Sequence, residues 1–509
     1  MWIATKEQSQ EIDRRATEEF GVPAMVLMER AGLAVFEATD QLLKGQGRVM
    51  VFCGHGNNGG DGFVAARILL EHGYHVDCLV AAEESHLREE CRLQMLQAQA
   101  QGVHPIYSSD PRFERKLECL GHHDLIIDAL LGLGAEGQLH GPVKDSIEAI
   151  NRSGVPVVSV DVPSGLDCNS GQDLGASVWA LRTVTFGLPK PFLFQGVGLE
   201  HSGYWSVAKI GFPPELLATP CDAKLIEREW VAGLLPERFR DSHKGTNGRL
   251  LIVAGSNQMR GAAILAAKAA LRSGIGLITV AGIESVCQAV MAHIPEATLL
   301  PLPESEGVIA PEAADIILHH QAQFSASLFG PGLAHEPPVK DFLTRLWNRW
   351  EVPSVIDADA LNAVSAGIIL PAAPSVLTPH PGEMARLLGK SVEEIQADRF
   401  SSALAATQKF GKTVLLKGPY SIVASGGDPM MVNQTGNSGM ASAGMGDVLS
   451  GVIATLLAQE LHPDEAAAAG MYWHGLSGDL CAQEIGHIGF TARDVAIHLP
   501  AARAKLIES

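Results

Sequence analysis

Short apolar segments alternate with longer amphipathic segments along most of the chain. Near its start, Thr5 can cap a helix that runs to about Phe20, and Pro23 can begin a second helix. From residue 48 onward, apolar runs typical of buried strands are each followed by a turn and a helical pattern. Such alternation is typical of a parallel, doubly wound sheet. The predicted strands include 48–53, 74–81, 125–129 and 155–160, and the predicted helices between them include 63–72 and 87–101.

The alternation stops around residues 212–222, where proline-containing turns leave no periodicity. A second alternating series begins with the apolar run 249–256 and continues to a helical C-terminus. A chain of 509 residues also exceeds what one hydrophobic core usually serves. We therefore predict two α/β domains, residues 1–215 and 222–509, of which the first is a Rossmann-like three-layer sandwich.

The composition narrows the classes of partner. With 38 basic and 57 acidic side chains, the formal net charge is −19. A surface this acidic repels phosphate backbones and anionic lipids, so we expect neither nucleic acid nor a membrane as partner. A ligand that carries phosphate must then be held locally, by backbone N–H groups, a few Lys or Arg side chains and bound cations.

The eight cysteines stand singly, without a CxxC pair or a Cys/His cluster. We interpret them as reduced thiols rather than as a disulfide or zinc framework. The N-terminus turns polar at once and lacks a signal-peptide core, and the most apolar window, 261–283, is interrupted by Lys268 and Arg272. We expect a soluble, cytoplasmic protein that forms a homo-oligomer.

A glycine-rich segment follows the first strand of the sheet: Gly54-His55-Gly56-Asn57-Asn58-Gly59-Gly60-Asp61-Gly62. It contains the pattern G-x-G-x-x-G, which would suit a dehydrogenase with Asp77 as the acid that binds the ribose. The pattern alone is weak, and Asn57, Asn58 and Asp61 make the loop more polar than hydride transfer requires. Because a carboxylate repels a pyrophosphate, we expect a nucleotide-like ligand with a cation nearby.

Two further predicted strands end in polar residues. One ends at Asp128, and the other ends at Asp161 with Ser164 shortly after it. The carboxyl ends of parallel strands are where open α/β sheets bind ligands. A single aspartate there is as often a helix cap or a turn residue, but three polar strand ends together favour a site.

The motifs GxGNNGGDG, IIDALLGLG and DVPSGLD, in this order, resemble the NAD(P)H-hydrate epimerase family over essentially residues 1–215. The resemblance implies a potassium ion held by Asn58, Asp128 and Ser164, whose oxygen atoms suit a hard monovalent cation. Asp161 is then the candidate for proton transfer. Lys190 is a weaker candidate, since it could simply be a lysine at a proline-rich turn. The residues implied to line the hydrated nucleotide are Asn57, Asn58, Gly59, Gly60, Asp61, Gly132, Leu133, Gly134, Ala135, Glu136, Gly137, Gln138 and Asp161.

The most informative segment of the second domain is 436–451, in which a run of small residues ends at Gly446-Asp447 and an apolar helix begins. Such a helix start offers unpaired N–H groups and the positive end of the helix dipole to a phosphoryl group. Asp447 can take the proton from an attacking hydroxyl, although it could instead serve only as the helix cap. The sequence contains no GxxxxGK[ST] motif, which excludes a P-loop.

The sequence GxGD before a helix resembles the ribokinase-like superfamily. The motifs GPGL, TPHPGE, KGPYS and NSGMASAGMGD narrow the resemblance to its NAD(P)H-hydrate dehydratase branch over roughly residues 222–509. The resemblance implies a ribokinase-like three-layer α/β/α domain that uses ADP as co-substrate. It implies that the hydrated nucleotide contacts Ala262, Gly332, His380 and Asp447, and that the adenine nucleotide contacts Lys417, Gly418, Pro419, Tyr420, Ser421 and Gly446.

Together the resemblances imply repair of hydrated NADH and NADPH: the first domain epimerises the hydrates, and the second dehydrates the S form with ADP. Asp447 would activate the ring hydroxyl to attack the β-phosphate, giving NAD(P)H, AMP and phosphate. Mg²⁺ would neutralise the transferring charge, with ligands that the sequence does not reveal. Two alternatives remain open. One is a ribokinase-like small-molecule kinase, and the other is a first domain that binds nucleotide without catalysis.

Overall fold

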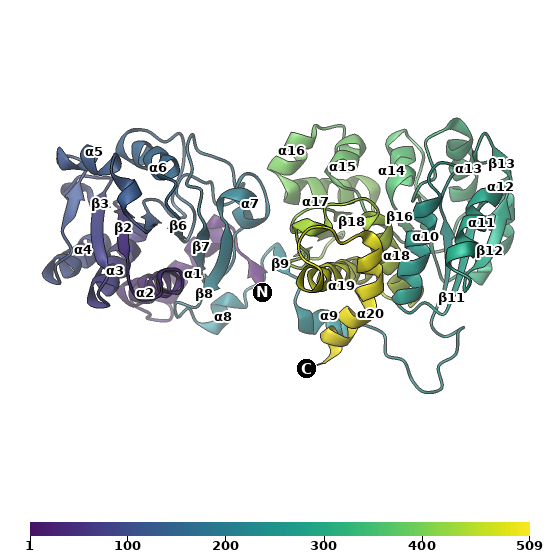
Figure 1. Ribbon diagram of the computed structural model, residues 1–509, viewed down its shortest axis with the longest axis horizontal. Helices are drawn as coiled ribbons and strands as arrows, with labels where there is room; N and C mark the ends of the chain where they lie inside the picture. The colour runs from purple at the N-terminus through teal and green to yellow at the C-terminus, as the bar shows by residue number, and fades with distance from the viewer. Residues whose placement is uncertain (509) are drawn as a thin grey trace. The chain divides into compact units, whose positions relative to one another are not determined.

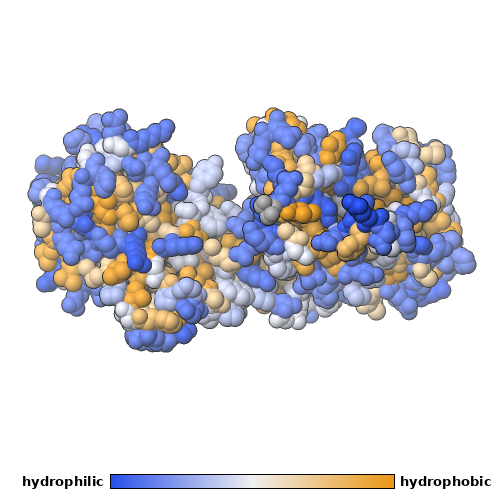
Figure 2. All heavy atoms as spheres, turned by 90° about the horizontal axis from the view of Figure 1, so that it is seen from below, coloured by the Kyte–Doolittle hydropathy of each residue, from blue (hydrophilic) through white to orange (hydrophobic). Residues whose placement is uncertain are grey.

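The computed structural model describes residues 1–508 and divides the chain into two compact units (Figure 1). The N-terminal unit comprises residues 2–222, and the C-terminal unit comprises Met1 and the chain from residue 223 onward. In the view of Figure 2, hydrophilic residues cover much of the visible face of each unit, with apolar residues scattered between them. Within residues 1–508, no helix is long and apolar enough to cross a membrane.

The N-terminal unit is built on a parallel sheet in the order β4-β3-β2-β5-β6-β7-β8. In β2, alternate residues face opposite layers. Val49 and Val51 pack with α2, α3 and α4, whereas Met50 and Phe52 pack with α5 and α6. The sheet is thus covered on both faces, as predicted. The strands are β2 (Arg48–Cys53), β3 (His75–Val80), β4 (Pro105–Tyr107), β5 (Leu125–Ala129), β6 (Val157–Val160), β7 (Arg182–Phe186) and β8 (Tyr204–Ala208); β1 is Trp2–Ile3. The helices are α1 (Lys6–Glu18), α2 (Ala24–Leu43), α3 (Asn57–Glu71), α4 (Glu89–Ala100), α5 (Arg112–Leu117), α6 (Gly141–Ser153), α7 (Gly198–His201) and α8 (Pro214–Leu217).

Two helix starts test the sequence predictions. Thr5 caps α1 in a capping box with Gln8, as expected. Helix α3, however, begins at Asn57 rather than near residue 63, so the glycine-rich segment is the first part of the helix and not a turn. Its glycines serve close packing, because a Cβ at Gly60 would lie 2.5 Å from Met28 Sδ.

The C-terminal unit is a second three-layer α/β structure, with strands in the order β9-β20-β19-β18-β17-β16-β15-β10-β11-β12. The strands are parallel except that β19 is antiparallel to both neighbours. Helices α18 and α19 pack on one face of the sheet together with α10 and α20. The strands are β9 (Ala223–Leu225), β10 (Arg249–Val253), β11 (Leu277–Ile283), β12 (Thr298–Leu302), β15 (Ala326–Phe329), β16 (Ser354–Ile356), β17 (Ser375–Leu377), β18 (Thr413–Leu416), β19 (Ile422–Ala424) and β20 (Met430–Val432), with a small hairpin of β13 (Glu304–Ser305) and β14 (Val308–Ile309). The helices are α9 (Arg228–Leu234), α10 (Arg260–Arg272), α11 (Glu284–His293), α12 (Ala313–His320), α13 (Pro337–Trp347), α14 (Ala358–Ser365), α15 (Pro381–Leu388), α16 (Val392–Ala397), α17 (Arg399–Phe410), α18 (Met445–Ala458), α19 (Pro463–Glu484) and α20 (Ala492–Ile507).

The sequence predicts that the cysteines are reduced thiols. All eight lie within residues 1–508 and are free thiols, and seven of them are buried while Cys119 is exposed.

Candidate functional sites

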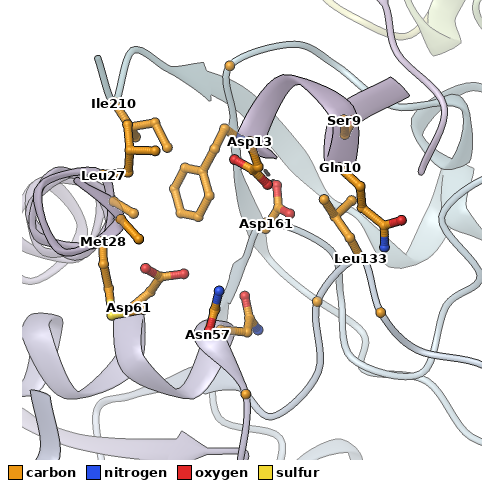
Figure 3. A pocket seen from close by; sticks show the side chains of 18 of the residues that line it. Ser9, Gln10, Asp13, Leu27, Met28, Asn57, Asp61, Leu133, Asp161 and Ile210 are labelled. Atoms are coloured by element: carbon orange, nitrogen blue, oxygen red, sulfur yellow. Dashed lines mark hydrogen bonds between the residues drawn. The ribbon is translucent and has the colours of Figure 1, made fainter. Parts of the chain in front are cut away.

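A cavity of about 490 Å³ opens at the carboxyl edge of the N-terminal sheet (Figure 3). The segments that follow β2, β5, β6 and β7 form one side of it, and residues of α1 and α2 form the other. Polar and apolar side chains both project into the open space. The polar ones include Asn57, Asp61 and Asp161, and the apolar ones include Leu27 and Met28. This combination of an apolar wall with a few polar groups is typical of a small-molecule site.

Asp161 and Lys190 form a buried ion pair in this cavity, with Lys190 Nζ 2.6 Å from Asp161 Oδ1. The same oxygen also accepts hydrogen bonds from Thr185 Oγ1 at 3.0 Å and from Phe186 N at 3.1 Å. The Lys190 ammonium group also donates hydrogen bonds to Thr185 Oγ1 (2.8 Å) and Phe186 O (2.9 Å). The three hydrogen bonds to the Asp161 carboxylate all go to Oδ1, which leaves Asp161 Oδ2 as the oxygen available to a ligand.

The backbone at Asp161 is strained. Its φ of 62° lies in the left-handed region that a residue with a Cβ seldom adopts. The hydrogen bond from Asp161 N to Val184 O, at 2.8 Å, fixes this conformation against β7. Strain of this kind concentrates at functional sites, where the surrounding structure holds a side chain in one direction.

Two more carboxyl groups face the cavity, those of Asp61 on α3 and Asp13 on α1 (Figure 3). Among residues 1–508, neither carboxyl group has a hydrogen-bond or ion-pair partner. Burial raises the pKa of Asp61 well above its usual range, and the charges of Asp161 and Asp13 add to this. Asp13 is exposed to solvent, yet the surrounding protein and the charge of Asp161 raise its pKa to about 6, against the opposing effect of Lys190.

Asp128, Ser164 and Asn58 meet directly behind the cavity wall. The buried Asp128 carboxylate accepts hydrogen bonds from Ser164 N and Ser159 Oγ, each at 2.8 Å, and from Ser164 Oγ. Asn58 Nδ2 donates to Leu131 O at 2.9 Å, and Ser164 Oγ lies 3.1 Å from the same carbonyl. Burial raises the pKa of Asp128 despite these hydrogen bonds. The group is an oxygen-rich cluster around one carboxylate with no cation among the described side chains beside it.

The structure brings most of the predicted N-terminal residues to the cavity and leaves others behind it. Gly59 and Gly60 are buried within α3. Glu136, Gly137 and Gln138 continue the loop beyond the cavity lining, and Asp77 pairs with His123 at 2.9 Å and Lys116 at 3.1 Å, away from the lining. The predicted residues that line the cavity are Asn57, Asn58, Asp61, Gly132, Leu133, Gly134, Ala135 and Asp161, together with Lys190.

Polar residues also converge at the strand ends of the C-terminal unit. Lys417, which follows β18, places its Nζ 2.8 Å from Asp357 Oδ1 and 3.8 Å from Glu383 Oε2. Burial alone would lower the pKa of Lys417, but the charges of Asp357 and Glu383 outweigh it and raise the pKa. The predicted residue Gly446 adjoins this pair, since a Cβ there would lie 3.4 Å from Lys417 Nζ.

Asp447 lies in the first turn of α18, directly after Gly446. Gly444 caps the helix with a φ of 86°, so the first N–H groups of α18 point out of the helix without partners inside it. Burial, together with the charges of Asp357 and Asp359 and against the opposing charge of Lys417, raises the pKa of Asp447 to about 7. A carboxyl group with this pKa exchanges its proton readily near neutral pH.

His380 is the N-cap of α15, and its Nδ1 accepts hydrogen bonds from Gly382 N at 3.0 Å and Glu383 N at 3.4 Å. Burial, aided by Lys417 and Arg386, lowers the pKa of this histidine. The ring is therefore neutral with its proton on Nε2, which lies 3.6 Å from Glu383 Oε1, beyond hydrogen-bond distance.

Two further groups of predicted nucleotide-binding residues lie together in the structure. A Cβ at Gly332 would lie 3.1 Å from Ala262 Cβ, so these two residues adjoin. Gly418 N donates to Ser421 Oγ at 3.2 Å, which closes the loop of residues 418–421, and Tyr420 holds a left-handed φ of 48° in it.

Sequence reasoning gave no role to three residues that the structure places at the sites. Asp357 and Glu383 contact Lys417. They lie at or near strand ends, and that position was the signal that could have identified them. Asp13 lies on a helix that precedes the sheet, where no comparable signal exists.

Comparison with known proteins assigns a family to each part of the chain. Residues 24–192 match the family described as the YjeF-related protein N-terminus, and residues 250–501 match the NAD(P)H-hydrate dehydratase family. A bifunctional NAD(P)H-hydrate repair enzyme of Moorella thermoacetica is 38% identical over 98% of this chain and 96% of its own length. The corresponding enzyme of Escherichia coli is 35% identical over 95% of this chain and 90% of its own length.

The C-terminal part also resembles proteins of known structure. The ADP/ATP-dependent NAD(P)H-hydrate dehydratase of Bacillus subtilis, co-crystallized with ATP and Mg²⁺, is 30% identical with a TM-score of 0.50. The similarity covers 56% of this chain and the whole of the other.

Proposed function

The chain belongs to the family of bifunctional NAD(P)H-hydrate repair enzymes, and from this membership we propose which residues perform its two reactions. The N-terminal part, residues 1–215 of our domain assignment, epimerises the R and S hydrates of NADH and NADPH. The C-terminal part, residues 222–509, dehydrates the S form with ADP and yields NAD(P)H, AMP and phosphate. The substrates are therefore small nucleotides. We also propose a cytoplasmic homo-oligomer, as expected from the sequence.

For the epimerase, the observation that carries the residue assignment is the buried Asp161–Lys190 pair in the cavity. Lys190 and two further donors occupy Oδ1, which leaves Oδ2 to meet the ring hydroxyl. Asp161 is then the proton acceptor, and Lys190 is a positioning residue rather than a second proton carrier. Asn57, Asp61 and the loop from Gly132 hold the rest of the nucleotide.

A potassium ion fits the cluster of Asn58, Asp128 and Ser164. The donors are an amide, a carboxylate and a hydroxyl, which suit a hard monovalent cation. The buried charge of Asp128 has no cationic partner among residues 1–508, so an ion there would offset its desolvation. Bound K⁺ would supply positive charge behind the loop that starts at Leu131, which carries the nucleotide-facing residues from Gly132 onward.

For the dehydratase, Asp447 is the general base. Its pKa of about 7 leaves it half ionised at neutral pH, which suits a group that must take a proton from a hydroxyl. The unpaired N–H groups at the start of α18 and the ammonium of Lys417 face the transferring phosphoryl group. His380 Nε2–H is oriented to donate to the hydrate. A Mg²⁺ ion would be held chiefly by the nucleotide phosphates, with Asp357 the nearest carboxylate beside Lys417.

One experiment tests both activities. A mixture of R and S NADPH hydrates is incubated with the full chain and ADP, and NADPH is followed at 340 nm. Recovery of nearly all of the hydrate supports both activities. Recovery that stops at the S fraction would refute the epimerase, and no recovery with ADP or ATP would refute the dehydratase.

A further inference from the structure

The epimerisation needs an acid as well as a base, and the cavity holds an unassigned carboxyl group suited to that role. Helix α1 carries Asp13 to the cavity (Figure 3), where the carboxyl groups of Asp13 and Asp161 both line the open space and interact electrostatically. Whereas Asp161 Oδ1 accepts three hydrogen bonds, the carboxyl group of Asp13 has no partner among residues 1–508. Within the described residues, therefore, no hydrogen bond holds the proton of the Asp13 carboxyl group in one position.

We propose that Asp13 is a second catalytic residue of the epimerase, the acid that protonates the ring nitrogen while Asp161 takes the hydroxyl proton. The assignment rests on the epimerase function proposed above. The environments of the two carboxyl groups separate their roles, because Asp161 is paired with Lys190 at 2.6 Å, whereas the surrounding protein and Asp161 itself favour the neutral form of Asp13.

The chemistry of the substrate requires such a pair. In the hydrate, one ring carbon carries the hydroxyl group and is bonded to the ring nitrogen. Loss of the hydroxyl would leave an iminium ion, which forms the dihydropyridine when it loses the neighbouring proton. That product belongs to the ADP-consuming reaction, and a route that keeps the oxygen on the carbon avoids it.

Opening of the carbon–nitrogen bond inverts the carbon without dehydration. Asp161 removes the hydroxyl proton, the O–H electrons become the second bond of an aldehyde, and the C–N electron pair moves to nitrogen. Asp13 delivers its proton to that nitrogen. After rotation about the adjacent carbon–carbon bond, nitrogen attacks the other face of the aldehyde. Its proton returns to Asp13, and the oxygen regains its proton from Asp161, so both residues and all atoms are restored.

Asp61 is less suited to this exchange. It is only 8% exposed, and burial raises its pKa well above the usual range. The titratable and charged groups that line the cavity with Asp13 are Arg14, His55, Asp61, Arg88, Asp161 and Lys190.

The test compares wild-type full-length protein with Asp13→Asn and with the control Glu37→Gln. Glu37 is exposed on α2 outside the cavity lining, so its change removes one charge without touching the site. Interconversion of purified R and S hydrates is followed by chromatography without ADP. We expect Asp13→Asn to lower kcat about 100-fold or more with KM within about twofold, and Glu37→Gln to change neither. ADP-dependent dehydration of the S hydrate should be unchanged in both.

The pH profile separates catalysis from structure. Because the acid acts in its protonated form, wild-type kcat for epimerisation should fall as the pH rises above about 6, and this limb should be absent in Asp13→Asn. A kcat of Asp13→Asn within about threefold of wild type, or an unchanged limb, would overturn the proposal. If circular dichroism shows that Asp13→Asn is unfolded, the wild-type profile decides, and a flat profile overturns it. A wild-type protein that does not interconvert the epimers would refute the epimerase itself.

Discussion

The raised pKa of Asp447 makes a quantitative prediction for the dehydratase. A base with a pKa of about 7 is roughly one-tenth ionised at pH 6 and roughly nine-tenths ionised at pH 8. The kcat/KM for dehydration of the S hydrate should therefore rise about tenfold between these pH values and level off above them. Asp447→Asn should lower kcat by about 10²- to 10⁴-fold at pH 8, the range expected for loss of a general base.

The neighbours of Asp447 predict how the rising limb moves. Lys417 lowers the pKa of Asp447, so Lys417→Met should shift the limb to higher pH, in addition to weakening nucleotide binding. Asp357 raises that pKa, so Asp357→Asn should shift the limb to lower pH. The pH profile of each variant is measured from initial rates at 340 nm with saturating ADP. Asp428 is exposed, and Asp428→Asn serves as the matched control. A profile that is flat between pH 6 and 8, or a Lys417→Met limb at lower pH, would refute the reasoning.

Three further predictions concern the N-terminal unit. A Cβ at Gly59 would lie 2.1 Å from Gly54 O, so Gly59→Ala should destabilise this unit by about 3 kcal/mol. Epimerisation should fall and dehydration should not, and unchanged hydrogen exchange in α3 would contradict this prediction. Asp128→Asn should abolish stimulation of epimerisation by KCl relative to NaCl, and a wild-type rate that is insensitive to K⁺ would argue against the ion site. Lys190→Met leaves Asp161 buried without its cation and should cost about 3–5 kcal/mol in urea unfolding of this unit, whereas a cost below about 1 kcal/mol would mean that the pair is not buried in solution.

Much of the fold could be predicted because it depends on local patterns. The apolar runs that end at Asp128 and Asp161 are strands β5 and β6, and adjacent parallel strands bring their carboxyl ends together. The convergence of polar residues in the C-terminal unit follows from the same rule, with Lys417 at the end of β18 and Asp357 at the end of β16.

What could not be predicted depends on packing between distant segments. The glycines after Asn57 resemble a turn in the sequence, but they belong to a helix because Met28 and Ala129 press against positions 60 and 62. Lys190 lies near prolines, so its sequence is equally typical of a lysine at a proline-rich turn, and only the structure shows that its side chain is buried against Asp161. Asp13 reaches the cavity only through the placement of α1, which no pattern near residue 13 encodes.

The acids with raised pKa values also couple folding to protons. In an unfolded chain, Asp447 would be ionised at neutral pH, whereas the folded protein keeps it partly protonated, and burial shifts the pKa of Asp61 in the same upward direction. Folding near pH 7 therefore takes up protons, and the free energy of unfolding should fall as the pH rises through the folded pKa values. Each fully linked proton contributes about 1.4 kcal/mol per pH unit. A shift to alkaline pH thus ionises the dehydratase base, and the same deprotonation lowers the free energy of unfolding.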